Sequence, residues 1–231
     1  EFIEGGTAAT IERLKGKANR DRLRDRIERG GEGFDNIAGM VGWENIIMST
    51  LNTPANKRFE GMTVRDIAKE RGTDPVDCVC DMLIEENCAI TMIEFITCEE
   101  DIARILNCGF ASVISDSIYP ASGRPHPRLY GTYARIIQRF VGERRDMTLE
   151  AAVKAMTYTP AKALNIADRG LLKEGLCADV NVFDPAEVKE RGSYADPDKC
   201  AAGMDYVFVN GKPAIAAGEL TGGAFGQVIR R

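Results

Sequence analysis

The stretch FASVISD, residues Phe110 to Asp116, is the part of the sequence that most clearly indicates the fold class. It consists of apolar and small residues followed by an aspartate. Such a run is typical of a strand that is buried on both faces in a parallel sheet. The next segment, 117–127, is rich in turn residues and contains three prolines. Long loops at the carboxyl ends of such strands are where α/β folds place their chemistry. The pattern predicts an α/β protein whose site follows residue 115.

The surrounding sequence alternates between helical and strand-like patterns, which also favours an α/β fold. Thr63 is a suitable cap for a helix that ends before Gly72, and Asp74-Pro75 is typical of the start of another helix. Helices are predicted over 7–30, 63–71, 74–87, 99–106, 131–142 and 149–156. Strands are predicted over 43–48, 89–95, 178–184, 204–209, 214–216 and 226–229. The segments 178–184 and 204–209 are expected to share one sheet outside the main fold.

Composition indicates a globular protein that acts on a small molecule or binds another protein. The 231 residues are 44% hydrophobic and 28% charged, and their net charge of −5 excludes the basic footprint of a nucleic-acid binder. No run of 18 apolar residues exists, so no membrane span is predicted. Seven cysteines at uneven spacings, without a C-x-x-C pair, predict free thiols in a reducing cytoplasm. The first residues are typical of the middle of a protein.

The residues with catalytic chemistry lie at the end of the predicted buried strand and in the loop after it. A carboxylate at the position of Asp116 can ligate a metal or accept a proton, although an aspartate there is often only a turn former. His126-Pro127-Arg128 follows in the loop. The guanidinium of Arg128 can hold a substrate carboxylate with two parallel hydrogen bonds, or it can form a surface ion pair.

The order of motifs resembles one enzyme family. ISDS at 114–117, HPRLYGT at 126–132 and the following Arg135 and Phe140-Val141 are similar to the last barrel strand and helix of N-acyl-D-amino-acid deacylases (D-aminoacylases). MTLEAAV at 147–153, RGLLKEG at 169–175, ADVNVFDP at 178–185 and VNG at 209–211 resemble the wider amidohydrolase superfamily. The resemblance covers nearly the whole chain and weakens before about Gly39.

This resemblance implies the C-terminal part of a (β/α)8 metal-dependent hydrolase barrel plus part of a small β-sandwich. Residues 1–168 would belong to the barrel, with an inserted helical segment at about 35–90, and residues 169–231 would supply strands of the sandwich. The implied reaction is hydrolysis of N-acyl-D-amino acids by water bound to zinc, which lowers the pKa of that water and polarises the amide carbonyl.

Four residues receive roles from the resemblance. Asp116 corresponds to the aspartate that contacts the metal and carries the proton from water to the leaving amine. Arg128 corresponds to the arginine that binds the α-carboxylate of the substrate. His126 and Thr97 are further candidates for substrate binding, and Thr97 corresponds by position to a contact with the acyl group.

One departure from the family limits what this chain can do alone. The metal ligands of the family are mainly histidines and a cysteine from earlier barrel strands, whereas this chain has a single histidine, His126. We therefore expect that the N-terminal part of the barrel is a required partner and that the chain alone is inactive and holds no zinc tightly. Two alternatives stay open: a catalytically silent fragment or binding module, and a cyclic amidase of the dihydroorotase or dihydropyrimidinase type.

Overall fold

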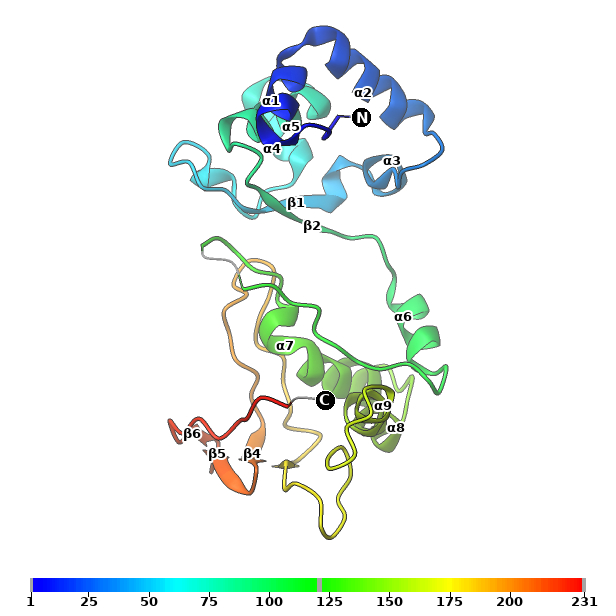
Figure 1. The fold of residues 1–231 in the computed structure, drawn as a ribbon, viewed down its shortest axis with the longest axis vertical. Coiled ribbons are helices and arrows are strands. Elements are labelled where there is room, and N and C mark those ends of the chain that lie inside the picture. Colours follow the sequence, from blue (N-terminus) through cyan, green and yellow to red (C-terminus); the bar gives the residue numbers. More distant parts are fainter. Residues whose placement is uncertain (1, 120–121, 230–231) are drawn as a thin grey trace. The chain divides into compact units, whose positions relative to one another are not determined.

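The computed structural model describes residues 2–119 and 122–229 and divides the chain into two compact units (Figure 1). Unit 1 comprises Glu1–Thr97 and Ile118–His126, and unit 2 comprises Cys98–Ser117 and Pro127–Arg231. Most of the proline-rich loop therefore belongs to unit 1, whereas the residues directly before and after it belong to unit 2. The predicted boundary at residue 168 concerns a complete barrel and stays a prediction.

Unit 1 is mainly helical, with one pair of short strands (Figure 1). Its elements are α1 (Gly6–Lys15), α2 (Lys17–Arg29), α3 (Ile37–Val41), η1 (Trp43–Asn45), β1 (Ile46–Thr50), η2 (Lys57–Phe59), α4 (Val64–Arg71), α5 (Pro75–Glu85) and β2 (Thr91–Glu94). Strands β1 and β2 pair antiparallel. The strand predicted at 43–48 begins only at Ile46, because residues 43–45 form a 3-10 turn.

The predicted helix boundaries around residue 72 are confirmed, and local chemistry explains them. The Thr63 hydroxyl accepts a hydrogen bond from the Asp66 amide at 3.1 Å, which caps α4. Gly72 ends this helix with φ of 68°, a left-handed conformation that favours glycine. The Asp74 carboxylate accepts bonds from the first amides of α5. Buried side chains from β1, α4 and α5, from η2 and from the residue after β1 form the main core of unit 1: Ile46, Met48, Leu51, Phe59, Val64, Ile67, Ala68, Cys78 and Met82.

Unit 2 joins helices to a four-stranded antiparallel sheet. Its elements are α6 (Glu99–Leu106), α7 (Arg128–Arg135), the π-helix η3 (Ile136–Glu143), α8 (Leu149–Met156), α9 (Tyr158–Ala163), β3 (Val180–Phe183), β4 (Met204–Val209), β5 (Lys212–Ala216) and β6 (Glu219–Leu220). The sheet order is β3-β4-β5-β6. The prediction that 178–184 and 204–209 share a sheet is therefore confirmed. Asn210 and Gly211 both have positive φ, as the tight turn between β4 and β5 requires.

Two predicted strands are absent from the described residues. The segment 110–115, which was expected to be a buried parallel strand, forms no regular secondary structure, and Phe110 and Ile114 are 82% and 66% exposed. Only Val113 in this segment is buried, and its amide donates to the Ala155 carbonyl at 3.0 Å. Residues 226–229 likewise have no neighbouring strand. Neither segment pairs with a strand of the two described sheets, whose orders are β1-β2 and β3-β4-β5-β6.

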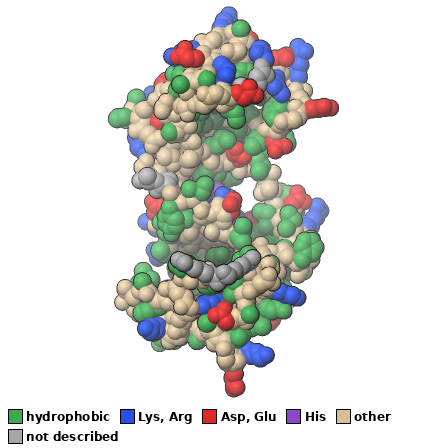
Figure 2. Space-filling view, in the orientation of Figure 1, with side chains coloured by type: hydrophobic (Ala, Val, Ile, Leu, Met, Phe, Trp, Pro, Cys, Tyr) green, Lys and Arg blue, Asp and Glu red, His purple; other side chains and the backbone are tan. Residues whose placement is uncertain are grey.

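Surface charge is mixed rather than concentrated. On the face visible in Figure 2, acidic and basic side chains are interspersed, in keeping with the 30 basic and 35 acidic residues of the sequence. Within the described ranges, no helix combines the length and the apolar character that crossing a membrane would require.

Candidate active site

Asp116 follows the segment 110–115 and has an unusual backbone conformation. Its φ is 45°, in the left-handed region that non-glycine residues seldom adopt and that aspartate tolerates better than most. Its side chain is 74% exposed. Such backbone conformations occur often at functional sites, where the surrounding structure maintains them. The turn therefore presents the carboxylate to solvent at the position where the sequence predicts chemistry.

Arg128 is the first residue of α7 and lies next to Asp116. Its Nη2 is 3.0 Å from Oδ2 of Asp116, and its side chain is 42% exposed. Pro127 precedes it with φ of −54°, a value that is compatible with the start of a helix. The structure thus brings together the two residues to which the sequence gives the main roles, from opposite ends of the proline-rich loop.

The other two predicted substrate-binding residues belong to unit 1. Thr97 is exposed and precedes Cys98, the N-cap residue of α6. His126 is half-buried and lies between two buried prolines, Pro125 and Pro127. The structure leaves their predicted roles untested, because the ion pair of Asp116 and Arg128 lies in unit 2.

A charged cluster that the sequence analysis did not predict surrounds Glu99. This carboxylate lies 2.8 Å from Arg135, 2.8 Å from Arg139 and 3.2 Å from Arg144. Hydrogen bonds from Arg139 hold the pKa of Glu99 below its usual value. Arg135 also pairs with Glu190 at 2.9 Å. The cluster therefore ties α6 to the continuous helix of α7 and η3, which begins at Arg128.

A sequence signal for this cluster existed. Arg135 and Arg139 are four residues apart, so they lie on one face of a helix, and Glu99 falls in the acidic first turn of a predicted helix. The sequence patterns did not predict that these two helices contact each other in the folded chain.

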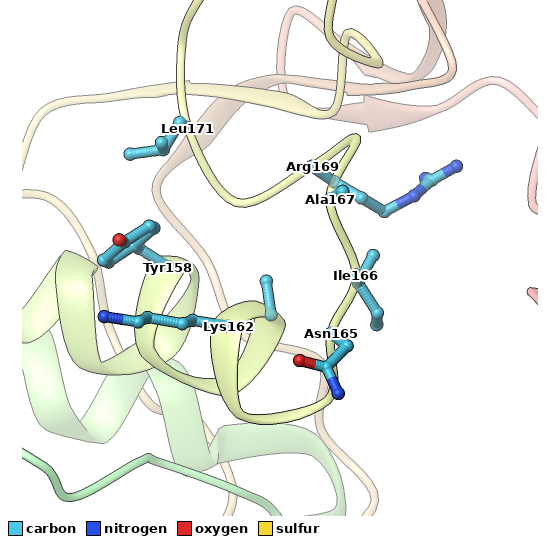
Figure 3. Close-up of a pocket in the computed structure, with 8 residues that line it drawn as sticks. Tyr158, Lys162, Asn165, Ile166, Ala167, Arg169 and Leu171 are labelled. Atoms are coloured by element: carbon cyan, nitrogen blue, oxygen red, sulfur yellow. The ribbon is translucent and has the colours of Figure 1, made fainter. Parts of the chain in front are cut away.

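A shallow cavity of about 330 Å³ lies elsewhere in unit 2, beside α9 (Figure 3). Its lining is mainly apolar and includes Ala161, Ile166 and Leu171. Arg169 also lines it, but this guanidinium pairs with Asp179 at 2.6 Å. None of the four predicted site residues lines this cavity.

Comparison with known proteins identifies the family. The model of the amidohydrolase family matches residues 52–215. The chain belongs to the amidohydrolase family. The matched range includes both residues of the ion pair, Asp116 and Arg128.

The curated relatives of this amidohydrolase chain are deacylases. It is 37% identical to the N-acyl-D-glutamate deacylase of Alcaligenes xylosoxydans xylosoxydans over 71% of its own length and 32% of that protein. It is 36% identical to the D-aminoacylase of the same organism over 75% of its length and 34% of that protein. The predicted resemblance to D-aminoacylases is thereby confirmed. The chain spans about a third of the length of these relatives.

Solved structures give the same result. A D-aminoacylase structure matches with a TM-score of 0.71 and 32% identity over 80% of this chain and 38% of that one. The N-acyl-D-glutamate deacylase from Bordetella bronchiseptica matches with a TM-score of 0.72 and 30% identity over 93% of this chain and 46% of that one. That enzyme was solved with zinc and a phosphonate that mimics the tetrahedral intermediate of its reaction. An α/β fold of the amidohydrolase type is therefore established.

The residues that the structure describes do not by themselves fit a catalytic zinc. Among residues 2–119 and 122–229, no three His, Cys, Asp or Glu side chains form a group that could hold a metal. The Asp116 carboxylate faces the Arg128 guanidinium. A catalytic zinc has three protein ligands, and one carboxylate falls short of that number.

Proposed function

We propose that this chain is part of an amidohydrolase that hydrolyses N-acyl-D-amino acids, with Asp116 and Arg128 at its site. The observation that carries the proposal is their ion pair at 3.0 Å, which joins a potential proton carrier to a potential carboxylate binder. The deacylase relatives, at 36% and 37% identity, support the same substrate class. In this proposal Asp116 transfers protons and Arg128 binds the substrate.

Asp116 is proposed to transfer protons. An exposed carboxylate accepts a proton from the attacking water and then delivers it to the departing amine as the amide bond breaks. Acid–base help of this kind is worth roughly 10²–10⁴-fold in rate.

Arg128 is proposed to bind the α-carboxylate of the substrate. A guanidinium can form two parallel hydrogen bonds with a carboxylate, whereas a lysine ammonium acts as a point charge. With the side chain 42% exposed, a substrate carboxylate has access to the group that Asp116 now contacts. N-acyl amino acids carry a free carboxylate and dihydropyrimidines do not, so this role favours the deacylase reaction over a cyclic amidase reaction of the dihydropyrimidinase type. His126 and Thr97 stay candidates for contacts with the rest of the substrate.

The complete enzyme is proposed to contain zinc in a (β/α)8 barrel. Its ligands other than Asp116 would come from residues outside this chain, since the described residues offer no ligand group. The unpaired segment 110–115, with Phe110 and Ile114 exposed, is proposed as the barrel strand that pairs with the remaining part. Residues 169–231 would then supply strands of the sandwich. All seven cysteines are free, which supports a reducing, cytoplasmic location.

The experiment uses the polypeptide as its gene encodes it. Release of free amine would be measured with N-acetyl derivatives of D-glutamate and D-methionine, their L enantiomers and the corresponding D-amino-acid amides. We expect turnover of the D-acids, a loss of about 100-fold or more in kcat for Asp116→Asn, and mainly a higher KM for Arg128→Lys. Near-normal kcat in Asp116→Asn would contradict its role, and an unchanged preference for the acid over the amide in Arg128→Lys would contradict that of the arginine.

A second candidate is a binding module without catalysis. The lack of a ligand group among the described residues favours it for this chain taken alone. Calorimetry would then show binding of an N-acetyl-D-amino acid, lost in Arg128→Lys, without any release of amine.

A further inference from the structure

The connection between β3 and β4, residues 184–203, packs along one face of the helix that begins with Arg128. Pro127, Gly131 and Arg135 are spaced four residues apart, so they lie on the same face of α7. The connection and this helix both belong to unit 2, as does the ion pair of Arg128. Contacts between the connection and the helix therefore lie within one compact unit.

The first contact is apolar and lies toward the far end of α7. Val188 is fully buried in a core cluster with Ala134 and Ile137. The next residue, Lys189, is bridged to Ala202, and each amide donates to the carbonyl of the other, at 3.1 and 3.0 Å. The two arms of the connection are therefore held together where the connection meets the helix.

Glu190 makes the central contacts with the helix. Its amide donates to Oε1 of Gln138 at 2.9 Å, and its Oε2 lies 2.9 Å from Nη1 of Arg135. Its side chain is 14% exposed. Gly131 is buried, and a Cβ there would lie 2.8 Å from both Cγ and Oε1 of Glu190. Glycine at position 131 therefore leaves the space that the Glu190 side chain occupies.

The connection then reaches Pro127, the residue before Arg128. A Cβ at Gly192 would lie 3.7 Å from Cβ of Pro127, which is ordinary van der Waals contact. Two residues later, burial raises the pKa of Tyr194, while the positive charges of Arg135 and Arg128 act in the opposite direction. The connection thus runs along the helix toward its start, where Arg128 lies.

Hydrogen bonds within the helix link these contacts to Arg128. The Gly131 amide donates to the Pro127 carbonyl at 3.0 Å, and the Thr132 hydroxyl donates to the Arg128 carbonyl at 2.7 Å. Arg128 is therefore part of the same hydrogen-bonded turn as Gly131. A displacement at Gly131 should move the backbone from which Arg128 extends toward Asp116.

We propose that the β3–β4 connection holds Arg128 in position for the substrate carboxylate, with Glu190 and Gly131 as positioning residues. They act through the helix: Glu190 fixes the face of α7, and Gly131 admits the Glu190 side chain one turn after Arg128. This inference rests on the proposed function for the role of Arg128. The competing explanation is that the connection only stabilises unit 2, without a specific effect on Arg128.

The first test follows Arg128 itself and needs no turnover. The polypeptide would be used as its gene encodes it, with isotope-labelled arginine, and the Nε–Hε signal of Arg128 in NMR spectra would be assigned by its loss in Arg128→Lys. We expect this signal to shift in Gly131→Ala, whose new Cβ displaces the Glu190 side chain, and in Glu190→Gln, which removes the charge that pairs with Arg135. An unchanged signal in both variants would overturn the inference.

Two matched controls separate positioning from a general change of the unit. Gly131→Ala and Gly142→Ala each replace a helical glycine by a better helix former, but a Cβ at Gly142 meets the Ile137 carbonyl oxygen at an ordinary 3.5 Å. Glu187→Gln removes the same charge as Glu190→Gln, from an exposed side chain of the same connection. Neither control should move the arginine signal, and shifts of equal size in controls and lead variants would overturn the inference.

A double variant tests whether Gly131 acts through Glu190. Glu190→Ala ends the side chain at Cβ, which removes the atoms that a Cβ at Gly131 would meet. Gly131→Ala should therefore shift the Arg128 signal much less in the Glu190→Ala background than in the wild type. Equal shifts in the two backgrounds would overturn the coupling between these residues, and with it the inference.

Kinetics of the same polypeptide distinguish this inference from the proposed function. If the wild type releases amine from N-acetyl-D-amino acids, KM should rise by roughly fivefold in Gly131→Ala and by roughly threefold in Glu190→Gln, with kcat nearly unchanged and a narrower preference for the acid over the amide. A loss confined to kcat, or unchanged kinetics in both variants, would overturn the inference. An inactive wild type would contradict the proposed function alone, and the Arg128 signal would then decide the positioning role.

Discussion

Two carboxylates of this chain have opposite surroundings. Glu86 in unit 1 is 3% exposed and accepts hydrogen bonds from the amides of Asn52 and Thr53, the Thr53 hydroxyl and the Asn56 side chain. Asp116 in unit 2 is largely exposed, turned outward by a left-handed backbone and paired with Arg128. A buried carboxylate whose oxygens accept hydrogen bonds from the protein contributes to the stability of the fold. One with open oxygens retains the capacity to meet water, substrate or metal.

The largest loss of stability is expected when the buried carboxylate of this comparison, Glu86, is replaced. Glu86→Gln would place an amide donor against donors in the 51–56 loop, and the unfolding free energy of unit 1 should fall by about 3 kcal/mol. Trp43 is the single tryptophan and packs against the core of unit 1, so its fluorescence during urea unfolding measures this unit. Glu85→Gln is the neighbouring control. Its exposed pair with Arg71 should cost less than about 1 kcal/mol, and equal losses in both variants would contradict the comparison.

Acid should lower the unfolding free energy of unit 1, because the carboxyl groups of Glu86 and Asp74 have lowered pKa values in the folded state. Burial raises the pKa of Glu86, but hydrogen bonds from Thr53, Asn56 and Asn52 outweigh it and hold the pKa below its usual value. Burial likewise acts against Asp74, whose hydrogen bonds with Asp77 and Arg24 nevertheless hold its pKa at about 2, while the hydrogen bond with Asp74 raises the pKa of Asp77 and offsets part of this effect. A lowered pKa in the folded state gives stability above the unfolded pKa, near about 4, that disappears as pH falls through the folded value.

Urea unfolding followed by Trp43 fluorescence between pH 7 and pH 2 would measure this loss. Unit 1 should keep its stability down to about pH 4 and lose it progressively toward pH 2. Glu86→Gln should show a smaller decrease over the same window, because one of the titrating groups is gone. A pH profile of the variant parallel to that of the wild type would mean that Glu86 does not contribute to it.

A smaller effect is expected where a carboxylate has several partners at the surface. Glu99 meets three arginines, yet it is 25% exposed, and solvent screens these ion pairs. Glu99→Gln should lower the stability of unit 2 by about 1 kcal/mol. Urea unfolding followed by circular dichroism would measure it, with Glu143→Gln, which removes a single exposed pair with Arg139, as the control. A loss as large as that of Glu86→Gln would show that the number of partners outweighs burial.

The same contrast explains which parts of the structure the sequence could predict. Caps such as Thr63, Gly72 and Asp74 act within a few residues of themselves, so the ends of α4 and the start of α5 could be predicted from local chemistry. A strand depends on a distant partner. The apolar run at 110–115 therefore predicted a buried strand for which the described chain offers no pairing neighbour.

The candidate site shows the same division. Asp116 and Arg128 were predicted because they belong to recognisable motifs, and the structure brings them into contact. The contact of Glu190 with α7 and the convergence of arginines on Glu99 join residues far apart in sequence. No local pattern reveals such contacts, since each residue taken singly is typical of a loop or a solvated helix face.

The smallest effect on stability is expected for Asp116→Asn. An exposed ion pair contributes about 0–1 kcal/mol, and the asparagine side chain can still accept a hydrogen bond from Arg128. Asparagine also tolerates the left-handed backbone at φ of 45°, so the turn should persist. The unfolding free energy of unit 2 should therefore change by less than about 0.5 kcal/mol. Circular dichroism during urea unfolding would measure it, and hydrogen exchange of the Val113 amide, which donates to Ala155, would report on the segment before Asp116.

Asp116→Ala is the matched comparison for this prediction. It removes the ion pair and also places a residue without a polar side chain in a left-handed turn, which costs more than the asparagine replacement. If Asp116→Asn is as destabilising as Glu86→Gln, the carboxylate at 116 serves the fold, and the division between a structural and an available carboxylate fails. If Asp116→Asn leaves stability intact but removes turnover in the gene-encoded polypeptide, that carboxylate is required by the reaction rather than by the fold.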